Sequence, residues 1–276
     1  MNISLATVVP FYKKNDTGLH VVNFDKANVK DFIKKPPVST KMECLRSRDE
    51  ILSVYNILFQ RVKSAQTENK EKNAMRNLTM YLCAINIGLR GGDFCKLKWK
   101  DVYDDDWNIR KQQQFVPEKT TYRDDEGHVI KRKYITLRYD GDFRFAISNW
   151  KMWLDSHNMS PDLDDFLFPS NKRSAISEKS WYDIVEEVRI EAGIKRKIGT
   201  HGLRKTYGHS YYKASSDKEK ALIQLMLIFG HSDMRITLRY ICISDEEIIE
   251  AQERMCIFSN ESNFSEDVEI ITGNGD

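Results

Sequence analysis

Residues 201–240 read HGLRKTYGHSYYKASSDKEKALIQLMLIFGHSDMRITLRY, and this stretch decides the fold of the chain. Apolar residues at helical spacing predict two helices in it, Leu203–Lys213 and Lys218–Phe229. His231 follows a glycine after the second helix, and Tyr240 stands nine residues further on. A lone histidine in such a place is usually a capping residue and a lone tyrosine usually belongs to a core, so any function has to come from their combination with other motifs.

The same spacing predicts further helices. In ILSVYNILFQRV, residues 51–62, the apolar side chains form one broad face, and Gly88 is expected to end a helix that contains Ala74–Ile85. The polar segment TENKEKN, residues 67–73, is expected to connect these two helices, and Asp93 to cap a short third one. The other predicted helices are Phe145–Leu154, Ser177–Ala192 and Ser244–Cys256.

The centre of the chain has a different pattern. Gln113–Thr120 and Val129–Leu137 flank a polar turn, Asp124 to Gly127, and the second arm alternates apolar and polar residues. This arrangement predicts a β-hairpin. We therefore expect a mainly α fold with one small antiparallel β-sheet.

Domain boundaries follow from changes in patterning. Residues 1–40 show no helical periodicity and end near Lys35-Pro36-Pro37, so we expect an N-terminal arm or linker. Residues 41–258 are expected to form the main domain, and 259–276 an acidic C-terminal tail. Because the sequence has neither a long apolar run nor a recognisable signal peptide, a cytoplasmic location without membrane contact is expected.

Cysteine usage and charge narrow the function classes. The five cysteines are odd in number and have no CxxC pair, so we expect reduced, structural thiols with no zinc site and no disulfide framework. The net charge of +2 gives no global argument for nucleic acid. Residues 195–213 nevertheless carry six Lys or Arg and no acid, whereas the chain after Ser244 is acidic, which fits a local anion-binding face.

Two arginines stand where an anion could bind. Arg204 lies in His201-Gly202-Leu203-Arg204 at an expected helix start, where a guanidinium and free backbone N–H groups together suit phosphate. Arg90 lies in GLRGGD, residues 88–93, at an expected helix junction. Taken singly, neither motif establishes a phosphate site: a surface arginine with a structural histidine is the more common explanation of residues 201–204, and a turn with a surface salt bridge explains Arg90 equally simply.

The order of the motifs is more specific than any one of them. GLR-x-x-D (88–93), LKW-x-DV (97–102), HxLR (201–204), GHS (230–232) and Tyr240 follow one another, with FLFPS and AGI as lesser markers between them. Together they resemble the tyrosine recombinase, or phage integrase, family over roughly residues 44–255. The resemblance implies the fold of that family's catalytic domain.

The resemblance also implies site roles. Tyr240 would be the nucleophile, with His201 accepting its proton and His231 donating a hydrogen bond to the phosphate. Arg90, supported by Asp93, and Arg204 would hold the phosphate oxygens. The lysine that the family carries on a β-hairpin is best matched by Lys119, although Lys131 or Lys133 could serve instead. The expected catalytic set is therefore Tyr240, Arg90, Lys119, His201, Arg204 and His231, and the expected backbone-phosphate contacts are Lys195, Arg196, Lys197, Lys205 and Lys213.

These residue types suit transesterification at a DNA phosphodiester, which gives a 3′-phosphotyrosyl link and a free 5′-hydroxyl. Arginines hold the charged oxygens at any working pH, and a base is needed because ionising a free tyrosine phenol at neutral pH costs about 4 kcal/mol. No metal and no cofactor are expected. The expected function is site-specific recombination for integration, excision or inversion of a mobile element.

The implied partners are double-stranded DNA, three further copies of the chain in a tetramer on DNA, and an accessory directionality factor. The family's usual core-binding domain is not predicted in the short segment before residue 41, so a truncated protein and a short recombinase both stay open. Two other functions also stay open: a type IB topoisomerase, which would relax DNA without a preferred site, and a DNA-binding descendant without activity.

Overall fold

The computed structural model describes residues 12–15, 18–21, 42–123, 126, 128–132, 134–243 and 249. The chain divides into two units, residues 1–41 and 42–276. In the first, strands β1 (Tyr12–Asn15) and β2 (Gly18–Val21) pair antiparallel. This hairpin was not predicted, because its two short strands lack a clear alternation of apolar and polar residues.

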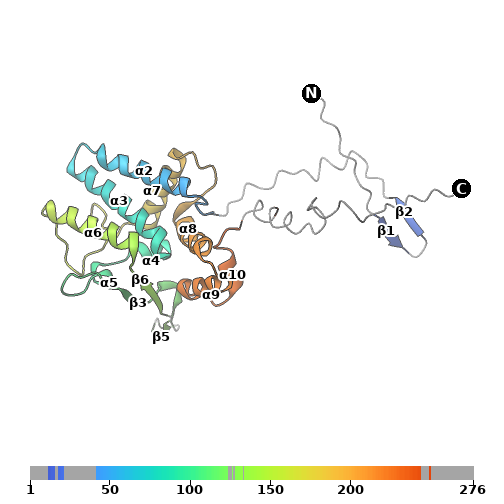
Figure 1. The fold of residues 1–276 in the computed structure, drawn as a ribbon. Helices are drawn as coiled ribbons and strands as arrows, with labels where there is room; N and C mark the ends of the chain where they lie inside the picture. Colours follow the sequence, from blue (N-terminus) through green and yellow to red (C-terminus); the bar gives the residue numbers. More distant parts are fainter. Residues whose placement is uncertain are drawn as a thin grey trace, which may run out of the picture. The chain divides into compact units, whose positions relative to one another are not determined.

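The second unit is mainly helical, as the sequence predicts (Figure 1). Helix α3 packs against α2, α6 and α8, and α7 packs against α2 and α8. The predicted polar connection at residues 67–73 is wrong: apart from Thr67, which caps α3 by accepting the N–H of Lys70, it forms the first turns of that helix. The helices named here are α2 (Arg48–Lys63), α3 (Glu68–Ile87), α6 (Gly141–Ser156), α7 (Glu178–Glu191) and α8 (Gly199–Ala214).

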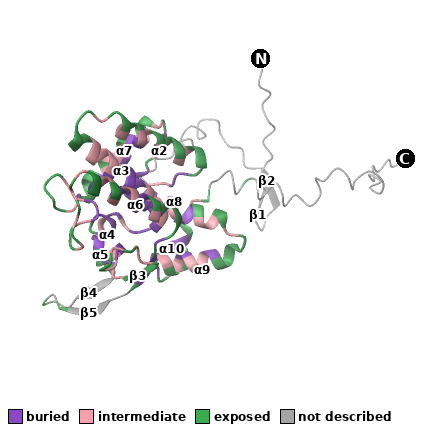
Figure 2. Ribbon diagram, turned by 60° about the vertical axis from the view of Figure 1, so that its left-hand side comes forward, coloured by how far each residue is buried: buried purple, intermediate pink, exposed green. Residues whose placement is uncertain are grey.

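Large aromatic side chains fill the core of this unit. Trp99, Trp150 and Trp181 are all at most 1% exposed, and each such burial stabilises the fold by about 1.5–3 kcal/mol. The polar atoms of the buried rings are satisfied: the indole N–H of Trp150 donates to the Leu167 carbonyl at 3.0 Å. Buried residues gather where α3, α6 and α8 meet (Figure 2).

The central hairpin exists but is interrupted. Strand β3 (Gln112–Phe115) pairs with β6 (Ile135–Arg138), and β4 (Thr121–Arg123) pairs with β5 (Val129–Arg132), both antiparallel. Between β3 and β4 lies the 3₁₀ turn η1 (Glu118–Thr120), so the predicted continuous arm 113–120 is wrong. Propensity alone does not reveal the turn, because it depends on a contact with a distant helix.

That contact comes from Asp93. Its carboxylate accepts the backbone N–H of Glu118 at 2.9 Å, which ties η1 to helix α4 (Gly91–Cys95). Asp93 was predicted to cap α4, but this prediction is wrong. Asp93 is the third residue of that helix, and Arg90 takes the cap position. Helix α5 (Trp99–Val102) follows, and α3 ends at Gly88, as predicted, in the left-handed conformation with φ of 66°.

Helix α8 begins at Gly199, four residues before the predicted start, so His201 lies in its first turn. Helix α9 (Lys218–Phe229) ends at Gly230, whose φ of 67° terminates it. Helix α10 (Met234–Leu238), which was not predicted, packs on α9 and is followed by Tyr240. The predicted helix Ser244–Cys256 falls outside the described residues except for Ile249. No helix among the described residues is long and apolar enough to span a membrane.

The segment before α2 runs along α8 as a strap, which we define as residues 42–46. Glu43 donates its N–H to the Lys197 carbonyl at 2.8 Å, and Leu45 donates to the Thr206 hydroxyl at 2.9 Å. Gly202 allows this approach, because a Cβ there would lie 2.2 Å from the Glu43 carbonyl oxygen.

Gly202→Ala is therefore expected to destabilise the domain by about 1–3 kcal/mol, because the strap has to move away from α8. Urea unfolding followed by circular dichroism measures the change. Ser210→Ala, on the exposed side of the same helix, is the matched control and should change stability by at most about 0.5 kcal/mol. Equal stability of the two variants would contradict the close packing of the strap.

Candidate active site

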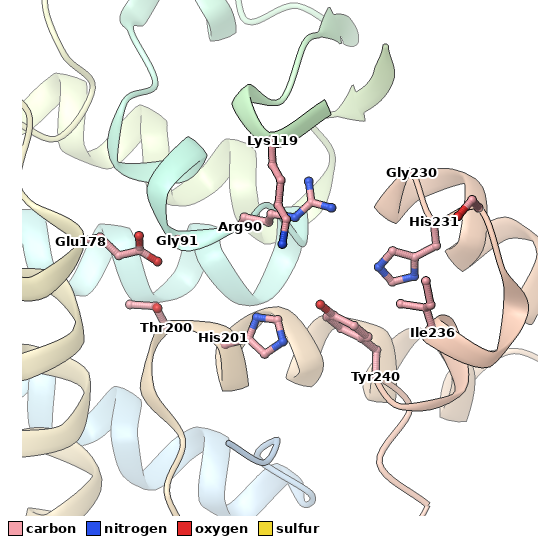
Figure 3. Close-up of a pocket in the computed structure, with 11 residues that line it drawn as sticks. Arg90, Gly91, Lys119, Glu178, Thr200, His201, Gly230, His231, Ile236 and Tyr240 are labelled. Carbon is pink, nitrogen blue, oxygen red and sulfur yellow. The ribbon is translucent and has the colours of Figure 1, made fainter. Parts of the chain in front are cut away.

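A cavity of about 460 Å³ opens between the N-terminal ends of α4 and α8, the η1 turn and the α9–α10 connection (Figure 3). Five of the six residues expected to be catalytic line it, and the sixth, Arg204, lies beside Tyr240. Segments more than a hundred residues apart in the sequence thus meet at one place. The lining residues are Arg90, Gly91, Lys119, Glu178, Thr200, His201, Gly230, His231, Ser232, Ile236 and Tyr240.

Arg204 is the most deeply buried charge of this site, with 1% of its surface exposed. Its Nη1 and Nη2 atoms donate to the carbonyls of Gly88 at 2.7 Å and Phe229 at 3.1 Å. Burial lowers the pKa of Arg204 to about 10, so it remains charged at neutral pH. Among the buried side-chain nitrogen and oxygen atoms of the described residues, its Nε alone has no hydrogen-bond partner, which leaves a donor for an anion.

Tyr240 lies at the centre of the group, 9% exposed. Its ring centroid is 5.0 Å from that of His201 and 4.9 Å from that of His231, and the Arg204 guanidinium lies 5.4 Å from the ring. The phenol opposes the effect of burial on the pKa of Arg204. Its backbone N–H donates to the Thr237 carbonyl at 2.8 Å, so the unpredicted helix α10 sets its position.

His201 is neutral in this environment. Burial, followed by the positive charges of Lys205, Arg204, Arg90 and Lys119, lowers the pKa of His201 to about 4. A neutral imidazole can accept a proton, and its ring lies at 68° to the Tyr240 ring in a T-shaped contact. His201 therefore has the protonation state and the position of a base.

His231 is 8% exposed, and its Nδ1 lies 3.0 Å from the Thr237 hydroxyl. Its backbone N–H donates to the Met226 carbonyl at 2.9 Å, directly after the left-handed Gly230. The contact of Nδ1 with Thr237 sets the orientation of the ring, which points into the cavity (Figure 3).

Arg90 and Lys119 bring two more cations to the cavity. Arg90 sits at the start of α4, and in the described part of the chain no carboxylate forms an ion pair with it. Lys119 is exposed on η1 and its side chain extends beside Arg90 (Figure 3). Of the alternative lysines, the side chain of Lys131 and all of Lys133 fall outside the described residues.

Thr200 and Glu178 line the cavity and were not predicted. Their oxygens pack over Gly91: a Cβ there would lie 2.7 Å from the Glu178 carboxylate and 2.9 Å from the Thr200 hydroxyl. Thr200 directly precedes His201, which is a weak signal, whereas nothing in the sequence connects Glu178 with residues 90–93.

The five predicted phosphate contacts have different surroundings. Lys205 is 4% exposed and its Nζ donates to the Met42 carbonyl at 2.6 Å, so its prediction as a phosphate contact is contradicted. Arg196 is paired with Glu50 and bonded to the Cys44 carbonyl, so its charge is already compensated. Lys195, Lys197 and Lys213 are exposed, but Lys213 lies near the far end of α8, about 18 Å from His201 along the axis.

Comparison with known proteins agrees with this geometry. A model of the family described as the phage integrase family matches residues 56–247, which is well over half of the chain. The chain belongs to the phage integrase family. A probable integrase/recombinase of Bacillus subtilis (strain 168), YoeC, is 29% identical over 179 residues, covering 64% of this chain and 82% of that protein.

Solved structures of the family share the fold at low sequence identity. The XerA recombinase superimposes with a TM-score of 0.55 at 19% identity, covering 80% of this chain and 66% of that one. The XerH site-specific recombinase, in a post-cleavage complex with its difH substrate, gives a TM-score of 0.55 at 21% identity, covering 76% of this chain and 52% of that one. This phage integrase family member thus spans about half to two thirds of the length of these recombinases.

The low pKa of His201 is testable in solution. Its ring should be half-protonated near pH 4 in the free protein, and addition of inorganic phosphate should move the midpoint upward because the anion offsets the surrounding cations. Because the folded state depresses this pKa, the stability contributed by the neutral ring should be full above about pH 6.5 and be lost as the pH falls toward 4.

NMR titration of the ring protons measures the midpoint, with His201→Gln identifying the signal. A midpoint above pH 6 in the phosphate-free protein would rule out the proposed environment of this histidine.

Proposed function

We propose that this phage integrase family member is a site-specific DNA recombinase that cleaves and rejoins strands through a 3′-phosphotyrosyl intermediate. The observation that carries the proposal is the placing of Tyr240 among two histidines, two arginines and a lysine around one cavity. A phenol in such cationic surroundings suits nucleophilic attack on a phosphodiester.

In this proposal, Arg90 and Arg204 bind the phosphate. The unpartnered Nε of Arg204 and the guanidinium of Arg90 offer donors that keep their charge at any working pH. The transition state carries extra negative charge on its non-bridging oxygens, so donors fixed beforehand stabilise it without reorganisation. His231 lines the same cavity and is proposed to donate a hydrogen bond to a phosphate oxygen.

The proton route uses two further residues. As the Tyr240 oxygen forms its bond to phosphorus, its proton passes to the neutral His201. The bond from phosphorus to the 5′-oxygen breaks, and Lys119 supplies the proton that the leaving oxygen takes up. The 5′-hydroxyl of a second strand then reverses these steps, so the energy of the broken bond is retained in the tyrosyl ester.

The partners follow from this chemistry and are part of the proposal. They are double-stranded DNA of a mobile element, a tetramer of this chain on DNA, and an accessory directionality factor. Lys195 and Lys197, exposed just before α8, are proposed to contact backbone phosphates. Such a protein would act in the cytoplasm, on nucleoid DNA.

Tyr240→Phe is expected to abolish the covalent adduct, because no oxygen remains to attack phosphorus. A nicked suicide substrate made from the native element's ends traps the adduct on a denaturing gel. Tyr212→Phe and Tyr211→Phe, on α8, keep the adduct and serve as matched controls. An adduct that persists in Tyr240→Phe at the level of these controls would refute the assignment of the nucleophile.

Lys119→Met is expected to slow cleavage of an ordinary phosphodiester by about 10²-fold or more, as loss of a general acid does. The same variant should cleave a substrate with sulfur in place of the bridging 5′-oxygen at nearly the rate of the unaltered protein, because a thiolate leaves without a proton. If Lys131→Met is rescued in this way and Lys119→Met is not, the role belongs to Lys131.

A further inference from the structure

Two cysteines at opposite ends of the helical unit meet beside α8. Cys44, in the strap, is fully buried, and Cys242, two residues after Tyr240, is half-buried. His209 contacts the Ile241 carbonyl, one residue before Cys242, and the Arg46 carbonyl, two residues after Cys44, which brings the two thiols near each other. No spacing in the sequence indicates this pair.

Contacts that do not involve sulfur hold the two segments together. The Nδ1 atom of His209 lies 2.7 Å from the carbonyl oxygen of Ile241, and its Nε2 atom lies 3.3 Å from that of Arg46. The histidine therefore holds both segments against α8. Lys205, one turn earlier, holds the strap through the Met42 carbonyl. The meeting of the cysteines is therefore fixed by the packing of α8.

The charges around the pair distinguish the two thiols. A hydrogen bond from Cys44, with smaller contributions from the charges of Lys205 and His209, lowers the pKa of Cys242 to about 6. The hydrogen bond to Cys242 and burial raise the pKa of Cys44, against the charges of Arg46 and Arg196. Cys242 is thus a thiolate at neutral pH beside a protonated partner.

The other described cysteines lack these features. Burial raises the pKa of Cys83 well above its ordinary value and that of Cys95 to about 12. Thiols of this kind are inert, whereas a partly exposed thiolate next to a second thiol is the arrangement of a redox-active pair.

We propose that Cys44 and Cys242 form a redox-active pair that a hydroperoxide converts into a disulfide. The Cys242 thiolate attacks the terminal peroxide oxygen, and the O–O bond breaks to give a sulfenic acid and an alkoxide, or hydroxide from hydrogen peroxide, which takes a proton from water. The Cys44 sulfur, losing its proton, then attacks the Cys242 sulfur, the S–S bond forms, and water leaves. The two thiols lose two electrons and the peroxide gains them.

The disulfide changes the site because Tyr240 is two residues from Cys242. It ties the tyrosine-bearing segment covalently to the strap, so that Tyr240 can no longer adjust to the position of the phosphate. Small displacements of a reacting group cost up to about 10²-fold in rate. This consequence rests on the proposed recombinase function. The oxidised protein should cleave DNA strands at least about tenfold more slowly than the reduced protein.

The pair is tested first without DNA. The full chain is treated with hydrogen peroxide, blocked with iodoacetamide and mapped by mass spectrometry. We expect a linked pair of peptides containing Cys44 and Cys242, lighter by two hydrogens and separated by dithiothreitol. Cys256→Ser should still form the link and Cys242→Ser should not. A folded, peroxide-treated chain in which both thiols are alkylated, or in which Cys242 is joined to Cys256, overturns the proposal.

Reactivity gives a second measurement. The rate of Cys242 alkylation should rise with pH through a midpoint near 6, and Lys205→Gln should move this midpoint upward. A midpoint near 8.5, as in free cysteine, would contradict the thiolate assignment.

The consequence for cleavage is measured separately on the nicked substrate. Oxidised protein should form the adduct at least about tenfold more slowly than reduced protein. Cys44→Ser and Cys44→Ala should be insensitive to peroxide. A disulfide that leaves the rate of the reduced protein unchanged overturns the regulatory consequence, whereas a reduced protein without any adduct overturns the recombinase function and leaves the disulfide result standing.

Discussion

The burial of Arg204 is the constraint on which the rest of the site depends. A charge removed from water costs several kcal/mol unless it is compensated, and here the compensation comes from carbonyls at the ends of two helices, Gly88 after α3 and Phe229 in α9. Both ends carry the negative pole of their helix dipole. The guanidinium therefore fixes α3, α8 and α9 at one point, and Tyr240 packs on the same guanidinium and on the Phe229 ring.

The 3.6-residue period of helix α8 places residues with different contacts on different faces of the helix. His201 lines the cavity and Arg204, three residues later, contacts Tyr240, whereas Gly202 and Thr206, four apart, receive the strap. Lys205 and His209, also four apart, hold the strap and the segment after Tyr240. One helix thus links residues of the candidate site with the cysteine pair, which explains why Lys205 is buried although it lies in a basic stretch.

Sequence reasoning identified those parts of the structure that depend on local signals. Apolar spacing predicted most of the helices. Motif order predicted that Arg90, His201 and Tyr240 belong to one site, and these three residues line one cavity. Prediction from the sequence failed where a contact between distant residues determines the local structure. The η1 turn depends on Asp93 reaching Glu118, Glu178 approaches Gly91 only through the packing of α7 on α4, and the burial of Lys205 needs the strap.

The charge of the free site follows from the same geometry. Its cations approach one another, because Glu178, over Gly91, is the only carboxylate among the described residues that line the cavity, and of the nearby acids Asp93 acts on Arg204. This repulsion is visible in His201, whose pKa the neighbouring cations lower together with burial. A bound phosphodiester would neutralise these cations and restore the basicity of the imidazole. The base would then become effective only when the substrate is in place, which couples proton transfer from Tyr240 to occupation of the site.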